Sequence, residues 1–288
     1  MRRTLPRLMW SLLEPIHALV YFAPETGDAL RDLGMKGWWM GYFAGRAGPL
    51  GAVGPKVVTA TFYNFRPEMV ERAIPDAWRY ATPGSVLDAR LVAMDAALRR
   101  VLGDEAVESQ ELALAARLAR VAVDGCEVTG RPLFAGHAQL PWPDEPHMVL
   151  WHAATLLREH RGDGHVAALL TSGLDGCEAL ITMTATGTIP RPLMQQARGW
   201  TDEEWSSAED RLRDRHWLDP ASQLTEDGRA GREEIEHLTD ALAASPWRAL
   251  GTETCSQLAA LLEPITDRVF EAGAVPVPNP IGISRRSS

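Results

Sequence analysis

The chain has few cysteines, and no motif pairs them. Its 288 residues include three cysteines, an odd number, which are widely spaced without a C-x-x-C pair: Cys126, Cys177 and Cys255. This usage disfavours a disulfide framework and a zinc ribbon. It is typical of reduced, buried thiols, so we expect a cytoplasmic protein.

Long apolar runs are also missing. No run reaches the roughly 18 residues that a transmembrane helix needs, so the sequence predicts no membrane partner. The N-terminal segment MRRTLPRLMWSLL is basic and then apolar, as in a signal peptide. Glu14, Pro15 and His17 interrupt it, and no small-residue cleavage site follows, so we expect no leader.

Positive charge is scarce relative to negative charge. The chain has 38 acidic and 29 basic residues and a formal net charge of −9. Its only obvious basic clusters are Arg2, Arg3 and Arg7 at one end and Arg285 with Arg286 at the other. Because phosphate contacts need clustered Lys and Arg, this composition disfavours a nucleic-acid-binding surface.

Several well-known catalytic motifs are absent. The sequence contains no G-x-S-x-G, P-loop or G-x-G-x-x-G pattern. It therefore gives no support to a serine hydrolase, a nucleotide hydrolase or a dinucleotide-dependent dehydrogenase. No pattern identifies a cofactor, and none decides whether the chain is an enzyme.

Most of the chain has helical periodicity, interrupted by short Gly/Pro turns and with little strand-like alternation. We predict an all-α protein with a minor β wing. The predicted helices cover 8–22, 26–33, 37–45, 67–72, 83–102, 109–123, 131–139, 147–159, 164–172, 176–185, 191–198, 201–215, 225–244 and 252–272.

Two parts of the chain are weakly similar to each other. Ile16-His17-Ala18 is similar to Trp151-His152-Ala153, and Arg66-Pro67-x-Met69 to Arg191-Pro192-x-Met194. Chance similarity between helices is the alternative to an internal duplication. Duplication predicts two winged-helix-like halves, residues 1–140 and 141–288, with a ligand cleft between them. Such a pseudo-dimer needs no second chain, so we expect a monomer, or a homodimer whose interface lies away from the cleft.

The region 190–240 has the clearest local pattern. A short helix is followed by Gly199, by Thr201 with Glu204 in capping-box spacing, by a second helix, by a short extended piece, and by a long helix. This is the order of a winged helix-turn-helix. RDRHWLDPASQLTEDGRAGREEIEHLTD (Arg211–Asp240) resembles the recognition-helix end, wing and following helix of MarR-like winged-helix proteins.

A second resemblance covers nearly the whole chain. It rests on YFAPE (21–25), GYFAGRAGPLG (41–51), PDAW (75–78) and LREHRGDGHVAAL (157–169). These segments resemble an actinobacterial family of largely uncharacterised helix-turn-helix proteins. The resemblance implies a fold and brings no known activity or catalytic residues.

The predicted recognition helix is acidic where DNA readers are usually basic. It begins Asp202-Glu203-Glu204 and continues with Glu209-Asp210, and those carboxylates would face phosphates. The wing, residues 219–223, is short and has no basic tip, unlike MarR-like wings. DNA is therefore a disfavoured partner.

The densest group of polar side chains lies in 141–170. We expect one helix to end near Arg161-Gly162-Asp163-Gly164 and a second to begin there, with Asp163 as its N-cap. A histidine oriented by a carboxylate can act as an acid or base near neutral pH, so the candidate catalytic residues are His152, Glu159 and His160. No metal is favoured because H-E-x-x-H is absent; a metal, if bound, would use His152, His160, His165 and Glu159.

Aromatic and polar residues alternate between 17 and 65, which is typical of a small-molecule pocket and also of a core. The predicted ligand-binding residues are His17, Tyr21, Glu25, Trp39, Tyr42, Arg46, Asn64, Trp151, Thr155, Arg158 and His165. Buried arginines need a partner. Arg46 and Arg158 therefore either pair with Glu25, Glu159 or Asp163, or receive a ligand oxyanion.

These observations favour one function over two alternatives. The first hypothesis is a winged-helix scaffold that binds a small, partly apolar organic molecule between its halves, with or without catalysis, and has lost DNA reading. The main alternative is a MarR-like, ligand-responsive transcription regulator. A purely structural partner-binding protein is the third.

Overall fold

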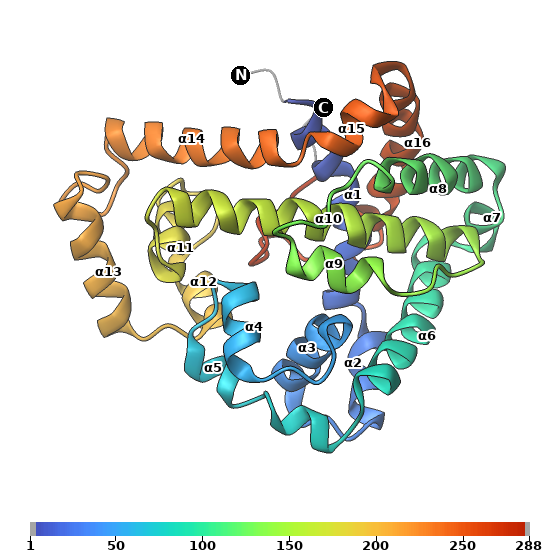
Figure 1. Cartoon of the computed structure of the whole chain (residues 1–288), viewed down its shortest axis with the longest axis horizontal. Coiled ribbons are helices and arrows are strands. Elements are labelled where there is room, and N and C mark those ends of the chain that lie inside the picture. The colour runs from blue at the N-terminus through green and yellow to red at the C-terminus, as the bar shows by residue number, and fades with distance from the viewer. Residues whose placement is uncertain (1–3, 286–288) are drawn as a thin grey trace.

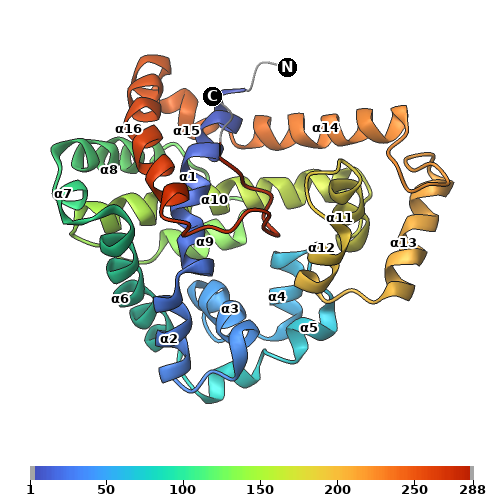
Figure 2. The same ribbon diagram turned by 180° about the vertical axis from the view of Figure 1, so that it is seen from behind.

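The computed structural model describes residues 4–285, and every regular element in this range is helical. Figures 1 and 2 show the helices wrapped around one central helix. The elements are α1 (Leu5–Phe22), α2 (Pro24–Asp32), α3 (Gly37–Ala47), η1 (Gly48–Leu50), α4 (Pro55–Phe62), α5 (Pro67–Glu71), η2 (Asp76–Arg79), α6 (Pro83–Leu102), α7 (Asp104–Val107), α8 (Gln110–Val123), α9 (Pro132–Ala138), α10 (Pro146–Thr171), α11 (Gly176–Thr184), α12 (Arg191–Arg198), α13 (Asp202–Asp214), α14 (Glu226–Leu242), α15 (Ser245–Leu250) and α16 (Thr252–Glu271).

The central helix is α10. It packs against α1, α8, α9 and α14, and it is buried over most of its length. A helix covered on all sides carries few exposed polar residues, so its polar side chains must find partners inside the protein. The polar residues between positions 152 and 163 lie at the centre of the structure because they belong to this buried helix.

The predicted break in this helix is wrong. α10 continues without interruption through Gly162, Asp163 and Gly164. Asp163 caps no helix; its Oδ2 accepts a hydrogen bond from the Phe134 backbone N at 2.9 Å. A Cβ at Gly164 would lie 3.1 Å from the Leu242 Cβ, so this glycine allows α14 to pack closely against α10 and does not form a turn.

The largest apolar core is built from both predicted halves. It combines side chains of α1, α6 and α8 with side chains of α10, α15 and α16, including Leu12, Leu98, Trp151 and Leu258. α1 lies against both α10 and α16. The division after residue 140 remains a prediction, and the core crosses it.

Two smaller cores flank the first. One is aromatic and lies among α3, α4 and α6, with Phe43 and Phe62 at its centre. The other holds α11, α12 and α13 together around Trp205 and Leu212. α12 and α13 are joined by a three-residue turn in which Gly199 has φ 78°, and the predicted capping box of Thr201 is present. The predicted order of short helix, Gly199 turn, capping box and second helix is therefore present.

The predicted β wing is reduced to one short antiparallel pairing. Residues 4–285 contain no strand, and the segment after α13 forms one isolated antiparallel bridge, Leu218 with Leu224. The Asp219 Oδ1 accepts hydrogen bonds from the backbone N of Ala221 and of Gln223, at 2.8 and 2.9 Å. Two backbone hydrogen bonds flank the bridge, from the Asp219 N to the Gln223 carbonyl at 2.9 Å and from the Thr225 N to the Trp217 carbonyl at 3.0 Å, so the wing is limited to this short pairing.

The C-terminal segment after α16 contains bends and turns and is held in place by hydrogen bonds. Asn279 is 2% exposed, and its side chain bonds the carbonyls of Pro276 and Ile283. The Arg198 Nη2 donates to the Pro280 carbonyl at 2.8 Å. The basic clusters noted at the termini fall partly on Arg2, Arg3 and Arg286, which lie outside the described residues.

No single helix between residues 4 and 285 is long and apolar enough to cross a membrane. α10 and α11 meet the length and composition criteria only when taken together, and the chain bends by 99° between them.

The glycines of α10 provide a test of its continuity. Gly162→Ala is expected to raise the free energy of unfolding by about 0.5–1 kcal/mol, because alanine favours a helix interior and the new Cβ meets only the Glu159 Oε2 at 3.6 Å. Gly164→Ala is expected to lower it by about 1–3 kcal/mol through overpacking against Leu242. Urea unfolding of both variants measures the difference, and a loss of stability in Gly162→Ala would contradict a continuous helix.

Candidate functional site

The site is built around Glu159, a fully buried carboxylate on α10. Its Oε1 lies 2.7 Å from the Arg158 Nη1, and its Oε2 lies 3.4 Å from the Arg46 Nη2. Burial alone would raise the pKa of Glu159, but the two guanidinium groups outweigh it and hold the pKa well below its usual range. The carboxylate is therefore charged, and it joins α10 to α3.

The charged group extends to α1. The Arg158 Nε donates to the Glu14 Oε1 at 3.3 Å, and the Trp10 Nε1 donates to the Glu14 Oε2 at 3.1 Å. Glu14, like Glu159, is almost completely buried. Arg158 thus bridges two buried carboxylates, and helices α1, α3 and α10 are held together by charge as well as by apolar packing.

A second chain of bonds fixes His17. The Thr155 hydroxyl donates to the Trp151 carbonyl, so it can only accept from the His17 Nδ1, 2.9 Å away. The neutral ring then accepts at Nε2 from the Tyr21 hydroxyl, at 3.0 Å. Burial, with Arg158 adding to it, lowers the pKa of His17 well below the usual value. Both ring nitrogens are therefore occupied and the ring stays uncharged at neutral pH.

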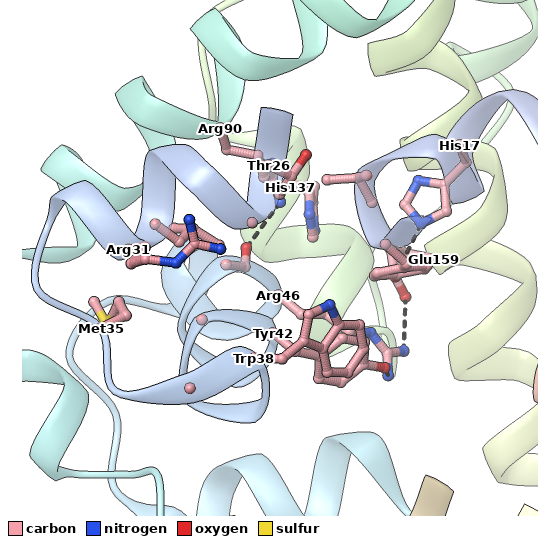
Figure 3. A pocket seen from close by; sticks show the side chains of 17 residues that line it. His17, Thr26, Arg31, Met35, Trp38, Tyr42, Arg46, Arg90, His137 and Glu159 are labelled. Carbon is pink, nitrogen blue, oxygen red and sulfur yellow. Dashed lines mark hydrogen bonds and ion pairs between the residues drawn. The ribbon is translucent and has the colours of Figure 1, made fainter. Parts of the chain in front are cut away.

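A cavity of about 270 Å³ opens beside this group, and we call it the α3 cavity (Figure 3). Its floor is the glycine-rich face of α3 and its polar end contains the ion pair of Arg46 with Glu159. It is lined by His17, Val20, Tyr21, Thr26, Gly27, Leu30, Arg31, Met35, Gly37, Trp38, Gly41, Tyr42, Gly45, Arg46, Arg90, His137 and Glu159.

Two buried basic residues complete the polar end of the α3 cavity. The Arg90 Nη1 donates to the Gly45 carbonyl at 2.9 Å, and burial lowers the pKa of Arg90 to about 10. The His137 Nδ1 donates to the Leu133 carbonyl at 2.9 Å, which leaves its Nε2 as an acceptor. Burial and then the charge of Arg90 lower the pKa of His137 to about 4, so His137 is neutral at pH 7.

A larger space of about 500 Å³ lies on the other side of Arg46, and we call it the arginine chamber. It shares Tyr21, Trp38, Tyr42 and Arg46 with the α3 cavity. Its charged or imidazole-bearing lining residues are Arg7, Glu14, Arg46, Arg158, Arg161, His165, Arg198, Arg232 and Glu236, and its aromatic ones are Trp10, Tyr21, Phe22, Trp38, Trp39, Tyr42, Phe62, Tyr63 and Phe65.

Most of the predicted ligand-binding residues line one of these spaces. His17, Tyr21, Tyr42 and Arg46 line the α3 cavity, and Tyr21, Trp39, Tyr42, Arg46, Asn64, Arg158 and His165 line the arginine chamber. The other three do not line either space. Glu25 pairs with Arg100 near the surface, Trp151 is a core residue, and Thr155 lies behind His17.

The predicted catalytic residues do not meet. His152 packs edge-on against Trp142, with ring centroids 4.8 Å apart, and His160 against Phe134, at 5.3 Å. Burial lowers the pKa of His152 to about 3 and that of His160 to about 4. Neither ring contacts Glu159, whose oxygens are bound by arginines. These residues therefore form no acid–base pair.

The residues named for a metal are also apart. The His165 Nδ1 faces the Thr239 hydroxyl at 2.9 Å, away from His152 and His160. Within 4–285, no group of three or more His, Cys, Asp or Glu side chains could hold a metal ion. The continuous helix explains this, because positions 152, 160 and 165 point from α10 to different neighbours.

Arg46 and Arg158 both pair with Glu159, as the structural-bridge alternative predicts. Many lining residues of these spaces were not predicted, among them Trp38, Arg90, His137 and Arg198. No sequence spacing connects α6, α9 and α12 to the group on α10, so only the fold could bring these residues to it.

The exposed face of α13 is acidic. It carries Asp202, Glu203, Asp210 and Asp214, together with Arg211. Arg211 pairs with Asp175 and with Glu178, at 2.5 and 2.9 Å. This cation is therefore neutralised within the protein.

The arginines that follow are engaged as well. Arg213 pairs with Asp210 at 2.6 Å and with Glu209 at 3.4 Å, and Arg215 donates to the carbonyls of Ser172 and Gly173. Basic side chains that read DNA must be available to phosphates and base edges. Those of this segment already have partners.

Comparison with known proteins gives one match. A sequence model of a helix-turn-helix family matches residues 6–276, nearly the whole chain. No curated protein matches. No solved structure matches.

The importance of the buried carboxylate can be measured. Glu159→Gln is expected to lower the free energy of unfolding by about 3–5 kcal/mol, because Arg46 loses its ion-pair partner and Arg158 keeps only Glu14. Glu25→Gln, which removes a carboxylate paired with Arg100 near the surface, should cost less than about 1 kcal/mol. Urea unfolding at pH 7 compares them, and equal losses would show that Glu159 has no special role.

Proposed function

The chain belongs to this helix-turn-helix family, and from that premise we propose that it uses the family scaffold to bind a small, partly apolar organic molecule in the α3 cavity. The observation that supports the proposal is a cavity of about 270 Å³ with aromatic walls and buried charged groups at one end. Ligand pockets usually measure about 300–1,000 Å³, so this one suits a small ligand.

The lining suggests how such a molecule would be held. Trp38 stacks on Tyr42, with centroids 5.2 Å apart and planes at 21°, and offers a flat apolar wall. At the polar end, the Nε atoms of Arg46 and Arg90 are buried without a hydrogen-bond partner. Buried donors cost free energy until they are satisfied. A ligand with an acceptor oxygen near one end of an apolar body would meet both requirements.

We propose binding rather than catalysis as the role of this cavity. Both nitrogens of His17 are bonded within the protein, and the Glu159 carboxylate is held by two arginines. Neither group has a free atom with which to exchange a proton. Residues of a single chain form the cavity, so the proposal requires no second subunit.

DNA reading is proposed to be lost. In a MarR-like arrangement α13 would enter the major groove. Its exposed carboxylates, Asp202, Glu203, Asp210 and Asp214, would face phosphates, and its arginines are paired within the protein. The regulator hypothesis requires a positively charged face on α13.

Native mass spectrometry of the purified protein tests the binding proposal. A small organic mass should be retained by the wild type and lost in Gly45→Leu, because the added side chain would occupy the α3 cavity. Gly45 is suitable because its own Cβ would meet only the Leu30 Cδ1, at 3.8 Å. Gly84→Leu, at an exposed position outside the cavity, should retain the ligand. Equal retention by both variants, or no retained mass in the wild type, would contradict the proposal.

Duplex titration tests the loss of DNA reading. Mixed-sequence duplex at low salt is expected to show no binding up to about 10 μM, in a range where basic proteins bind nonspecifically. The combined variant Asp202→Lys, Glu203→Lys and Asp210→Lys should gain binding that falls steeply as salt rises, because it presents cations on the same face. Salt-dependent binding by the wild type would favour the regulator.

A further inference from the structure

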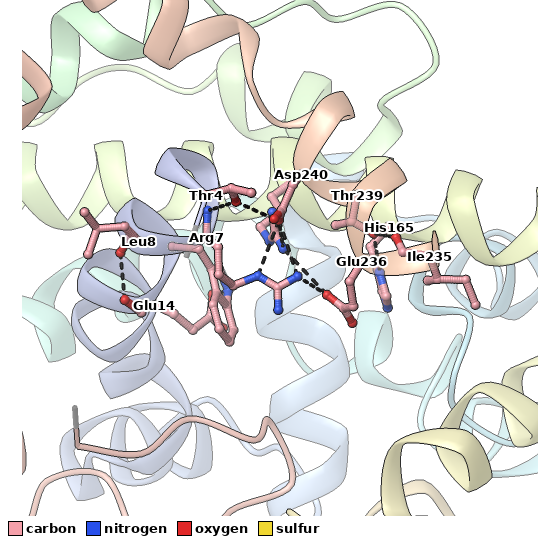
Figure 4. A network of polar contacts seen from close by, with 12 residues as sticks. Thr4, Arg7, Leu8, Glu14, His165, Ile235, Glu236, Thr239 and Asp240 are labelled. Atoms are coloured by element: carbon pink, nitrogen blue, oxygen red, sulfur yellow. Dashed lines mark hydrogen bonds and ion pairs between the residues drawn. The ribbon is translucent and has the colours of Figure 1, made fainter. Parts of the chain in front are cut away.

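We propose that the arginine chamber is a second binding site, for a ligand that carries two or more anionic oxygen groups of the phosphate or carboxylate class. The site would be centred on Arg7 of α1, Arg161 of α10 and Arg232 of α14 (Figure 4 shows the surroundings of Arg7). This centre uses residues that do not line the α3 cavity, although the two spaces share Tyr21, Trp38, Tyr42 and Arg46, and the proposal does not rest on the function proposed above.

Three guanidinium groups share two carboxylates at this centre. Arg7 contacts both Glu236 and Asp240, Arg161 pairs with Asp240 at 2.7 Å, and Arg232 pairs with Glu236 at 2.6 Å. Their side chains are only 10–27% exposed. One positive charge therefore remains without a counter-charge in a mostly buried place, which is costly unless an anion joins it.

Arg161 has a donor to spare. The residue is 8% exposed, and its Nη2 is the nitrogen that pairs with Asp240. Its Nη1 is buried without a hydrogen-bond partner. A guanidinium binds an oxyanion best through two parallel N–H bonds, and Arg161, which lines the chamber, could supply one of them through its unpartnered Nη1.

The excess of positive charge continues along the chamber. Arg46, Arg158 and Arg198 also line it, which brings the number of lining arginines to six. The carboxylates that line the chamber or bond to these arginines are four: Glu14, Glu159, Glu236 and Asp240. Six minus four leaves an excess of two positive charges, in a protein whose formal net charge is −9. Such a local reversal of charge attracts anions.

The spread of the arginines indicates more than one anionic group. The Arg198 Nε, like the Arg161 Nη1, is buried and unpartnered, and Arg198 belongs to α12, which lies on the opposite side of α10 from α14 in Figures 1 and 2. A chamber of about 500 Å³ is too large for a single phosphate or carboxylate. A ligand with two or more oxyanion groups could bind separate donors along the chamber. The aromatic walls would cover the part of the ligand between those groups.

The neighbouring histidine adds no positive charge to the chamber at neutral pH. His165 lies beside Glu236 and Thr239, and its Nδ1 is 2.9 Å from the Thr239 hydroxyl. Burial lowers the pKa of His165 to about 4, so the ring is neutral at pH 7. The positive excess of the chamber is therefore that of its arginines.

Isothermal titration of the full chain with pyrophosphate and, separately, with citrate tests the site. We expect at least one of the two to bind, with affinity that falls as salt rises. Arg161→Gln should weaken this binding by tenfold or more. Glu236→Gln should strengthen it, because it removes a carboxylate that competes with the ligand. Arg100→Gln, which removes an arginine outside the chamber, should leave it unchanged.

The outcomes separate the explanations. Binding of pyrophosphate alone assigns the phosphate class, and binding of citrate alone assigns the carboxylate class. If Arg161→Gln does not fold, as judged by circular dichroism, Arg232→Gln replaces it. No binding of either anion, unchanged binding in the arginine variant, or weaker binding in Glu236→Gln would overturn the proposal. Gly45→Leu should bind the anions normally, so the loss of the organic ligand in that variant cannot be mistaken for failure here.

Discussion

The burial of one carboxylate constrains the structure more than any other interaction. Glu159 has no exposed surface, and a charge without water must be matched by opposite charge at close range. Arg46 of α3 and Arg158 of α10 provide it, and Arg158 also reaches Glu14 of α1. These ion pairs hold three helices from distant parts of the sequence in one arrangement. Both internal spaces lie next to this group of charges.

Charge is distributed in opposite ways inside and outside the molecule. Arginines gather on the walls of the internal chamber, whereas the exposed face of α13 is acidic and its arginines are paired. A helix-turn-helix protein that binds DNA needs basic side chains at its surface, because phosphate contacts are made there. This distribution of charge underlies the proposals of an internal anionic ligand and of lost DNA reading, on a scaffold shared with a helix-turn-helix family.

Features that depend on neighbouring residues were predicted well from the sequence, whereas contacts between residues far apart in the chain were predicted poorly. The all-helical class, the bounds of α6 and α12 and the capping box at Thr201 follow from short-range patterns, and the structure has them. The turn predicted at Gly162–Gly164 was wrong because close packing against Leu242 gives the same glycine signal as a chain break. α4, α7 and α15 were missed. Arg90, His137 and Arg198 could not have been assigned to the internal spaces, because their places depend on tertiary packing.

The wall between the two internal spaces has a consequence for their occupancy. Tyr21, Trp38, Tyr42 and Arg46 face both sides, and Arg46 holds Glu159 by a long contact of 3.4 Å with a donor to spare. Under the two proposals, a ligand that draws these side chains toward one space would change the free energy of binding in the other. Linkage makes that effect equal in both directions. If both proposed ligands bind, cooperativity, which is usually associated with oligomers, would follow within a single chain.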